Sequence, residues 1–180
     1  VTGLHVSAGG SASPFADAVR ELTARAAGED LPGRLAATGA DIAVVEGVMG
    51  LFDGYDKWKG SSAEIALAIN APVILVVNAK SVAYSVAPLI YGFSRFNPRL
   101  KIAGVVFNNV ASENHFSFLQ SACRDAGCEC LGYMTRIPEL EIPGRHLGLT
   151  ISEKENMERI ISIAAKEIEA HFDIDKLLAL

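Results

Sequence analysis

Two carboxylates and several glycines stand close together where an apolar run ends. Glu46 closes the run, Asp53 comes seven residues later, and Gly47 and Gly50 lie between them. Glycines let the main chain approach a ligand closely, and two carboxylates in one loop offer the oxygen ligands that Mg²⁺ takes. The spacing therefore predicts a nucleotide and metal site. The alternative is a glycine-rich turn in which Glu46 pairs with a lysine and Asp53 caps the turn.

Aromatic and hydroxyl side chains follow this acidic loop. Tyr55 opens a mixed aromatic and basic stretch, Tyr-Asp-Lys-Trp-Lys, which suits a large anionic ring. Ser61 and Ser62 open a predicted helix, where hydroxyls and N–H groups can bind an anionic carboxylate. Simple capping of the helix would explain both serines equally well. We therefore expect substrate contacts at Tyr55, Ser61 and Ser62, with capping as the alternative for the serines.

Short apolar runs rich in β-branched residues predict strands that are buried on both faces. They cover residues 41–46, 72–77 and 102–107, and a weaker run covers 128–133. The acidic loop follows the first run directly. Because ligands bind at the carboxyl ends of strands in open α/β sheets, the residues just after each strand are the main site candidates.

Segments of helical length separate or follow these runs. Helices are predicted for residues 61–69, 82–96, 112–126 and 152–171. Ser61 and Glu64 have capping-box spacing, and Gly127 suits a left-handed helix end. The last helix places Met157, Ile160, Ile161, Ala164 and Ile168 on one stripe. Alternating strands and helices predict a three-layer α/β domain, with a mainly parallel sheet covered by helices on both faces.

The composition excludes several classes of partner and cellular location. Sixteen Lys and Arg against 21 Asp and Glu give the 180 residues a net charge of −5, so we expect no nucleic-acid partner. No apolar run approaches the ~20 residues of a membrane span, and residues 1–13 do not read as a secretory signal. We therefore expect one cytoplasmic domain over 1–180 with no membrane partner. Its three cysteines, an odd number, are expected to be free thiols.

A set of motifs in a fixed order carries a family resemblance. The acidic loop reads Glu-Gly-Val-Met-Gly-Leu-Phe-Asp-Gly over 46–54. The motifs that follow are Ser-Ser-Ala at 61–63, Ala-Pro-Val at 71–73, Ile-Ala-Gly-Val-Val-Phe-Asn-Asn at 102–109, Glu113 with His115, and Pro-Gly-Arg-His-Leu-Gly-Leu at 143–149. Together they resemble the ATP-binding domain of the cobyrinic acid a,c-diamide synthase family. The resemblance is carried by about residues 40–149, and residues 1–39 are left unassigned.

The resemblance implies a P-loop NTPase fold related to dethiobiotin synthetase, and a ligase of cobalamin biosynthesis. In such an enzyme ATP and Mg²⁺ activate the a and c acetate carboxylates of a cobyrinate-type tetrapyrrole. A glutaminase domain then supplies ammonia from glutamine, which forms the amides. The macrocycle is left open, because related enzymes act on a nickel sirohydrochlorin. A homodimer is compatible with this family.

The resemblance also implies roles for individual residues. Glu46 would hold the Mg²⁺ that bridges the β- and γ-phosphates, and Asp53 would lie beside the reacting groups with a metal or orientation role. Asn108 would contact adenine through its carboxamide, with a turn at a strand end as the alternative. Arg145 and His146 would cover the nucleotide or contact the macrocycle, with a solvated loop pair as the alternative.

The sequence departs from the family pattern in two respects. No Gly-x-x-x-x-Gly-Lys-Ser/Thr motif occurs, and Gly-Gly-Ser at 9–11 lacks the lysine that reaches the terminal phosphates. The cysteines lie inside the ligase-like region, so none is expected to be the glutaminase nucleophile. The first residue is Val1 rather than Met. We therefore expect a truncated fragment without P-loop and glutaminase domain, which would bind ATP poorly and would not complete the reaction alone.

Three other functions fit parts of the sequence. A non-catalytic regulatory or binding domain of the dethiobiotin-synthetase type would keep the sheet without turnover, but it has no physical need for two acids among glycines. Cobyric acid synthase has a related architecture, and Leu-Phe-Asp-Gly at 51–54 favours the a,c-diamide enzyme over it. A partition-type ATPase would associate with DNA, and the absence of a basic stripe counts against that.

Overall fold

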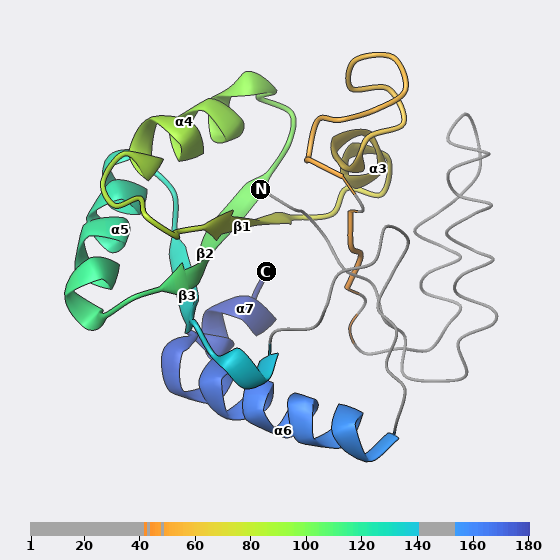
Figure 1. The fold of residues 1–180 in the computed structure, drawn as a ribbon. Coiled ribbons are helices and arrows are strands. Elements are labelled where there is room, and N and C mark those ends of the chain that lie inside the picture. Colours follow the sequence, from red (N-terminus) through yellow and green to blue (C-terminus); the bar gives the residue numbers. More distant parts are fainter. Residues whose placement is uncertain (1–41, 43, 48, 141–153) are drawn as a thin grey trace. The chain divides into compact units, whose positions relative to one another are not determined.

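A computed structural model describes residues 42, 44–47, 49–140 and 154–180 (Figure 1). The elements along the chain are α3 (Ser62–Ala68), β1 (Val73–Asn78), α4 (Val86–Phe96), β2 (Ile102–Val110), α5 (Glu113–Asp125), β3 (Cys130–Thr135), the 3-10 turn η1 (Pro138–Leu140), α6 (Lys154–His171) and α7 (Ile174–Leu178). Within the described ranges, no helix is both long and apolar enough to cross a bilayer.

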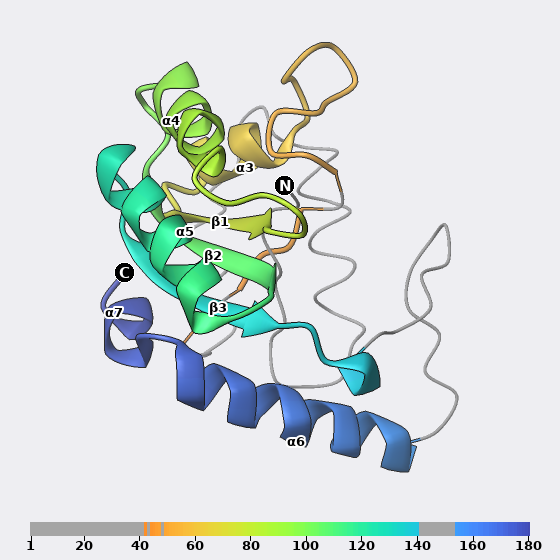
Figure 2. The ribbon, with the colours of Figure 1, turned by 60° about the vertical axis from the view of Figure 1, so that its left-hand side comes forward.

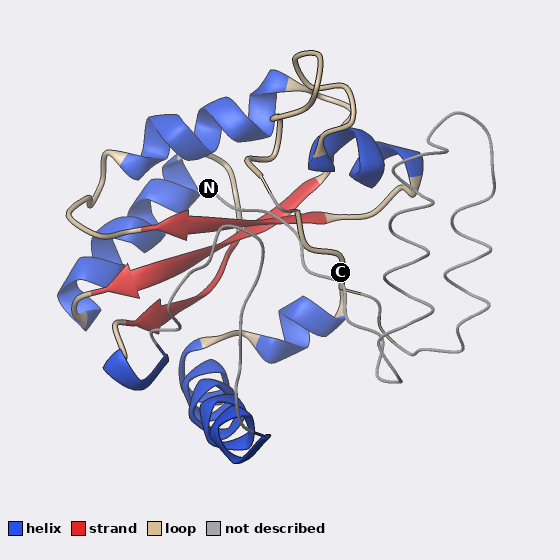
Figure 3. Cartoon of the chain, turned by 45° about the vertical axis from the view of Figure 1, so that its right-hand side comes forward, coloured by secondary structure: helices blue, strands red, loops and turns tan. Residues whose placement is uncertain are grey.

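The three strands form one parallel sheet in the order β1-β2-β3. Val73 at the start of β1 donates its N–H to the carbonyl of Lys101 just before β2, at 2.8 Å. Past the end of β1, Ala79 donates to the carbonyl of Asn108 near the end of β2, also at 2.8 Å. Strands β2 and β3 are parallel too, and the three arrows of Figure 3 point the same way. The α/β class and the strands predicted at 72–77, 102–107 and 128–133 are confirmed.

The described chain falls into two compact units, and we describe each by itself. One combines residues up to 76 with 92–104, and the other combines 77–91 with 105–180. The buried side chains of the first unit include Leu51, Ala63, Ala66, Val73, Leu75 and Leu100. Those of the second include Val77, Val86, Ile90, Val105, Phe107, Leu119, Cys123 and Leu131. Each unit therefore has an apolar core made mostly of strand and helix residues.

The strand predicted at 41–46 is wrong for the residues that the structure describes. Ile42 and the segment 44–46 belong to no strand. The side chains of Ile42 and Val44 are 56% and 48% exposed, although the prediction had them buried on both faces. An apolar run forms a buried strand only where a neighbouring strand satisfies its backbone groups, and the described sheet contains β1, β2 and β3 alone.

The helices begin and end close to the predicted residues, with one clear shift. Helix α4 starts at Val86, four residues later than predicted. The backbone of Ser81 is left-handed, with φ of 60°, and the N–H of Val82 donates to the carbonyl of Ala79 in a turn. The chain therefore makes a turn before the helix can begin. Gly127 ends α5 with φ of 71°, as predicted.

The C-terminal segment covers the outer edge of β3, beside which α6 lies (Figure 2). Phe172 forms an isolated antiparallel bridge with Gly132, and Asp173 donates its N–H to the carbonyl of Leu131 at 2.9 Å. Gly132 has φ of 147°, and a Cβ there would come within 2.7 Å of the His171 carbonyl oxygen. The segment reaches the strand this closely because Gly132 has no side chain. The bridge and this hydrogen bond also pair backbone groups at the edge of β3.

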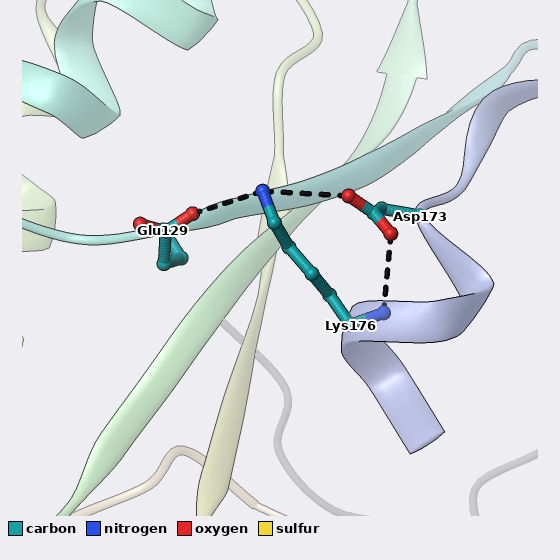
Figure 4. A network of polar contacts seen from close by, with 3 residues as sticks. All are labelled: Glu129, Asp173 and Lys176. Carbon is teal, nitrogen blue, oxygen red and sulfur yellow. Dashed lines mark hydrogen bonds and ion pairs between the residues drawn. The ribbon is translucent and has the colours of Figure 1, made fainter. Parts of the chain in front are cut away.

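Aromatic contacts and the ion pairs of Lys176 also join the C-terminal segment to β3 and its neighbours. The Tyr133 ring lies 4.2 Å from the ring of Phe116 in α5 and 4.4 Å from that of His171 in α6. Burial raises the pKa of Tyr133. Lys176 of α7 lies 3.3 Å from both Glu129 and Asp173 (Figure 4), and these carboxylates raise its pKa. The ring contacts stabilise the packing of the C-terminal segment on β3, while the exposed ion pairs contribute little to stability.

The α6 stripe is confirmed only in part. Ile160, Ala164 and Ile168 are partly covered, whereas Ile161 is 57% exposed. Helix α6 contacts β3 along one face, and Ile161 lies outside that face because it is offset by one position from Ile160. The side chain of Met157 lies outside the described part.

The three cysteines are free thiols. Cys123 of α5 is buried, and its thiol pairs with that of Cys130 in β3. This hydrogen bond and burial raise the pKa of Cys123, while the same bond lowers the pKa of Cys130. Both cysteines thus join α5 to β3 within the second unit.

Candidate functional site

The acidic loop is anchored by two apolar side chains of its own unit. Leu51 is 1% exposed, and its carbonyl accepts the N–H of Ala63 at 2.9 Å. The Phe52 ring lies 5.9 Å from that of Phe93, in stacked geometry, and 4.8 Å from that of Phe96, edge to face. The polar residues around Leu51 and Phe52 are therefore held on a fixed base.

Asp53 folds back over the turn that precedes it. Its N–H donates to the carbonyl of Gly50 at 2.9 Å. A Cβ placed on Gly50 would lie 3.1 Å from the carboxylate carbon of Asp53 and collide with one carboxylate oxygen. Gly50 therefore provides the close approach expected from the sequence, but to Asp53 of the same loop. The Asp53 side chain itself is exposed.

Glu46 lies at the start of this loop with an exposed side chain, and Gly47 next to it is buried. Among the residues that the structure describes, no group of three or more His, Cys, Asp or Glu side chains could hold a metal ion. A closed protein cage for a metal is thus absent from this part of the chain. Mg²⁺ does not require one, because it commonly binds through one or two carboxylates together with water and phosphate oxygens. The exposed carboxylates of Glu46 and Asp53 fit that kind of site.

A small hairpin over residues 54–60 follows the acidic loop. Gly54 donates its N–H to the carbonyl of Lys57 at 2.8 Å, and Tyr55 donates to that of Lys59 at 3.0 Å. A Cβ on Gly54 would lie within 2.8 Å of the Lys59 carbonyl carbon. The hairpin closes tightly because glycine stands at that position.

The hairpin presents Tyr55 to solvent. The Tyr55 side chain is 86% exposed, and its ring lies against Gly60, where a Cβ would come within 2.7 Å of the ring. Lys59 forms an ion pair with Asp56 at 3.1 Å, so its charge is partly neutralised within the predicted basic patch. Tyr55 and the exposed Lys57 are the members best placed to meet a large anionic ligand.

Ser61 and Ser62 have different surroundings. Ser61 is the N-cap of α3, and its Oγ accepts the N–H of Glu64 at 3.4 Å. The Glu64 carboxylate accepts the N–H of Gly60, one residue before the expected capping-box partner. Ser61 is also 1% exposed. Capping thus explains Ser61, while the half-buried Ser62 has the more accessible hydroxyl; a substrate contact at either residue stays a prediction.

In the second unit, asparagines gather where β1 and β2 end. The exposed Asn108 accepts the N–H of Asn109 on its Oδ1 at 2.9 Å. Asn109 donates from Nδ2 to Oδ1 of Asn78 at 3.0 Å, and the same Oδ1 accepts the N–H of Lys80 at 3.1 Å. Sequence reasoning singled out Asn108 but missed Asn78 and Asn109. Asn78 ends an apolar run just as Asn108 does, so the same signal could have found it.

His115 joins the loops that follow the two strands. Its Nδ1 accepts the N–H of Ala111 at 3.1 Å, and its Nε2 lies 2.6 Å from the carbonyl oxygen of Val82. This arrangement matches the tautomer with hydrogen on Nε2. Ser112 caps α5 and accepts the N–H of His115 at 3.1 Å. His115 is therefore part of the scaffold that shapes this end of the sheet.

Two sets of predicted residues lie outside the described part of the chain. They are Arg145 with His146, and the Gly-Gly-Ser segment at 9–11 that lacks the P-loop lysine. The contacts expected of Arg145 and His146 stay predictions.

Comparison with known families decides the kind of domain. Residues 12–143 match the family described as AAA domain, which is more than half of the chain. The chain belongs to the AAA domain family. This family is of the P-loop NTPase type, which confirms the fold expected from the resemblance and supports nucleotide binding. No solved structure matches the chain.

Curated relatives of this AAA domain share one kind of activity in their names. Cobyrinate a,c-diamide synthase of Listeria innocua is 46% identical over 77% of the chain, and that of Caldanaerobacter subterraneus is 44% identical over 80%. Hydrogenobyrinate a,c-diamide synthase of Brucella ovis is 42% identical over 82%. The matched part is 32–34% of each relative, so the chain spans about a third of their length. The family resemblance read from the sequence is confirmed.

Proposed function

We propose that the protein carrying this AAA domain amidates the a and c acetate carboxylates of a cobyrinate-type tetrapyrrole. The reaction uses ATP, Mg²⁺ and ammonia released from glutamine by a glutaminase domain. The observation that carries the proposal is the identity of 42–46% with a,c-diamide synthases over about four fifths of the chain. Their names also favour this enzyme over cobyric acid synthase.

In this proposal the residues of the acidic loop act in phosphoryl transfer. Glu46 would hold Mg²⁺, and the bound ion would supply positive charge that offsets the charge of the triphosphate during phosphoryl transfer to the substrate carboxylate. Asp53 orients the reacting groups from the turn that Gly50 makes possible. The exposure of both carboxylates supports these roles, because each side chain can reach a ligand without rearrangement of a core.

The remaining site residues bind the two organic ligands. Asn108 contacts the adenine base, since a carboxamide both donates to and accepts from a base edge. Tyr55 offers an exposed aromatic face to the macrocycle, with the cation of Lys57 two residues away. Ser62 at the start of α3 contacts a substrate carboxylate, while Ser61 fixes the helix end.

Product analysis tests this assignment directly. We expect the full-length protein containing this chain, supplied with Mg·ATP and glutamine, to add two amides to cobyrinate or hydrogenobyrinate, as seen by mass spectrometry. Fragment masses should place both amides on the a and c side chains. Amidation of other side chains would instead indicate cobyric acid synthase. A folded protein that forms no amide under these conditions would support the non-catalytic domain.

A further inference from the structure

The ends of β1 and β2 are joined by a side-chain hydrogen bond beyond the backbone pairing of the sheet. Asn109 Nδ2 donates to Asn78 Oδ1 at 3.0 Å. That oxygen also accepts the N–H of Lys80 at 3.1 Å, so both of its lone pairs have a donor. We call this pair of asparagines the Asn78–Asn109 clasp. It ties the loop after β1 to the end of β2.

The clasp coincides with an irregularity in β2. Phe107 pairs with Tyr133 and Val110 pairs with Thr135, so β2 contains one more residue than β3 over this stretch. Asn109 has a left-handed backbone with φ of 61°. Asparagine is among the few residues other than glycine that accept this conformation. Such bulges redirect side chains, often beside active sites.

Two hydrogen bonds hold Asn108 at the bulge. Its carbonyl accepts the N–H of Ala79 at 2.8 Å, and its Oδ1 accepts the N–H of Asn109 at 2.9 Å. The direction in which the Asn109 N–H points, and so its hydrogen bond to Asn108 Oδ1, depends on the left-handed backbone of Asn109. The clasp fixes the side chain of Asn109 and thereby restricts that backbone. The orientation of the exposed Asn108 carboxamide thus depends on Asn78 through Asn109.

We infer that Asn109 is a positioning residue for base recognition. Clasped to Asn78, it presents the Asn108 carboxamide to the base of a bound adenine nucleotide. The inference rests on the adenine contact given to Asn108 in the proposed function. It adds two residues, Asn78 and Asn109, that touch no ligand themselves and set both affinity and preference for adenine over guanine.

Asn109→Gly removes the clasp and its restriction on the backbone, while glycine can still adopt the left-handed conformation without strain. Nucleotide binding is measured on the full-length protein containing this chain by titrating Mg·ATP and Mg·GTP to millimolar concentrations and following amide chemical shifts. The wild type should prefer ATP. Loss of one orienting hydrogen bond should weaken ATP binding about fivefold in Asn109→Gly and bring the ATP and GTP affinities together. Asn78→Asp keeps the acceptor oxygens and should retain most of the preference.

Asn97→Gly is the matched control. Asn97 Oδ1 accepts the N–H of Arg99 at 3.1 Å, as Asn78 Oδ1 accepts that of Lys80, but Asn97 belongs to the other unit and to no clasp. Its nucleotide affinities should equal those of the wild type. If Asn109→Gly fails to fold, Asn78→Ala removes the clasp from the opposite side and should lose the preference in the same way.

The outcomes separate the inference from the proposed function. Wild-type ATP affinity and preference in folded Asn109→Gly or Asn78→Ala would overturn the positioning role and leave the proposed function standing. A full-length wild-type protein that shows no shift with either nucleotide would contradict nucleotide binding at this site, and both the inference and the proposed function would fall. A double variant no weaker than either single variant would support a clasp that acts as one unit.

Discussion

At the scale of single residues, Ser61 caps a helix, and the proposed substrate contact is assigned to its neighbour Ser62. Removing the Ser61 cap should lower the free energy of unfolding by about 1 kcal/mol, because the Glu64 N–H loses its acceptor. Ser62→Ala should leave stability nearly unchanged and raise the KM for the tetrapyrrole. Thermal unfolding and steady-state kinetics of the two variants check this division. A raised KM with unchanged stability in Ser61→Ala would reverse the two roles.

The family resemblance is what singled out a candidate site residue at a strand end. Asn108 follows an apolar run, but its adenine contact was predicted from the resemblance and stays a prediction. The partnership of Asn78 with Asn109 was missed because it joins two strands that a single sequence does not place side by side. The burial that separates Ser61 from Ser62 was equally hidden, since both serines have the same residue type and adjacent positions.

At the scale of elements, Gly132 controls how closely the segment after α6 docks on β3. Gly132→Ala would place a methyl group within about 3 Å of the His171 carbonyl and of Phe172, in a backbone conformation with φ of 147° that side chains disfavour. We expect a loss of about 3 kcal/mol in the free energy of unfolding. Chemical denaturation with the fluorescence of the single tryptophan or circular dichroism measures it.

Gly92→Ala is the matched control for Gly132→Ala. Gly92 lies within α4, and a Cβ there meets nothing within 4 Å. The same substitution should therefore stabilise the protein by about 0.5–1 kcal/mol through helix propensity. Equal effects of the two substitutions would contradict the docking described for Gly132.

The apolar runs predicted β1, β2 and β3 because a strand buried on both faces needs continuous apolar residues. The run at 41–46 has the same pattern, yet its described residues form no strand. An apolar pattern indicates only that a segment can be buried. Whether the segment forms a buried strand depends on a neighbouring strand that pairs with it. The late start of α4 was hidden for a similar reason, because the left-handed Ser81 is set by the turn around it rather than by residue type.

At the scale of the whole molecule, the family follows from the set of motifs rather than from any one of them. The AAA domain match over residues 12–143 and the a,c-diamide synthase relatives agree with the order of motifs read from the sequence. The chain spans about a third of those relatives. Complete turnover is therefore a property to be tested in the full-length protein.

The central claim is that the carboxylate of Glu46 holds the divalent cation against the triphosphate, and Glu46→Gln in the full-length protein tests it most directly. Amidation with Mg·ATP should fall by about 100-fold or more, because a neutral amide binds Mg²⁺ weakly. Excess Mg²⁺ should recover part of the rate. Glu139→Gln, at an exposed position in η1, should leave the rate unchanged. Wild-type amidation at ordinary Mg²⁺ concentration in folded Glu46→Gln would contradict the account.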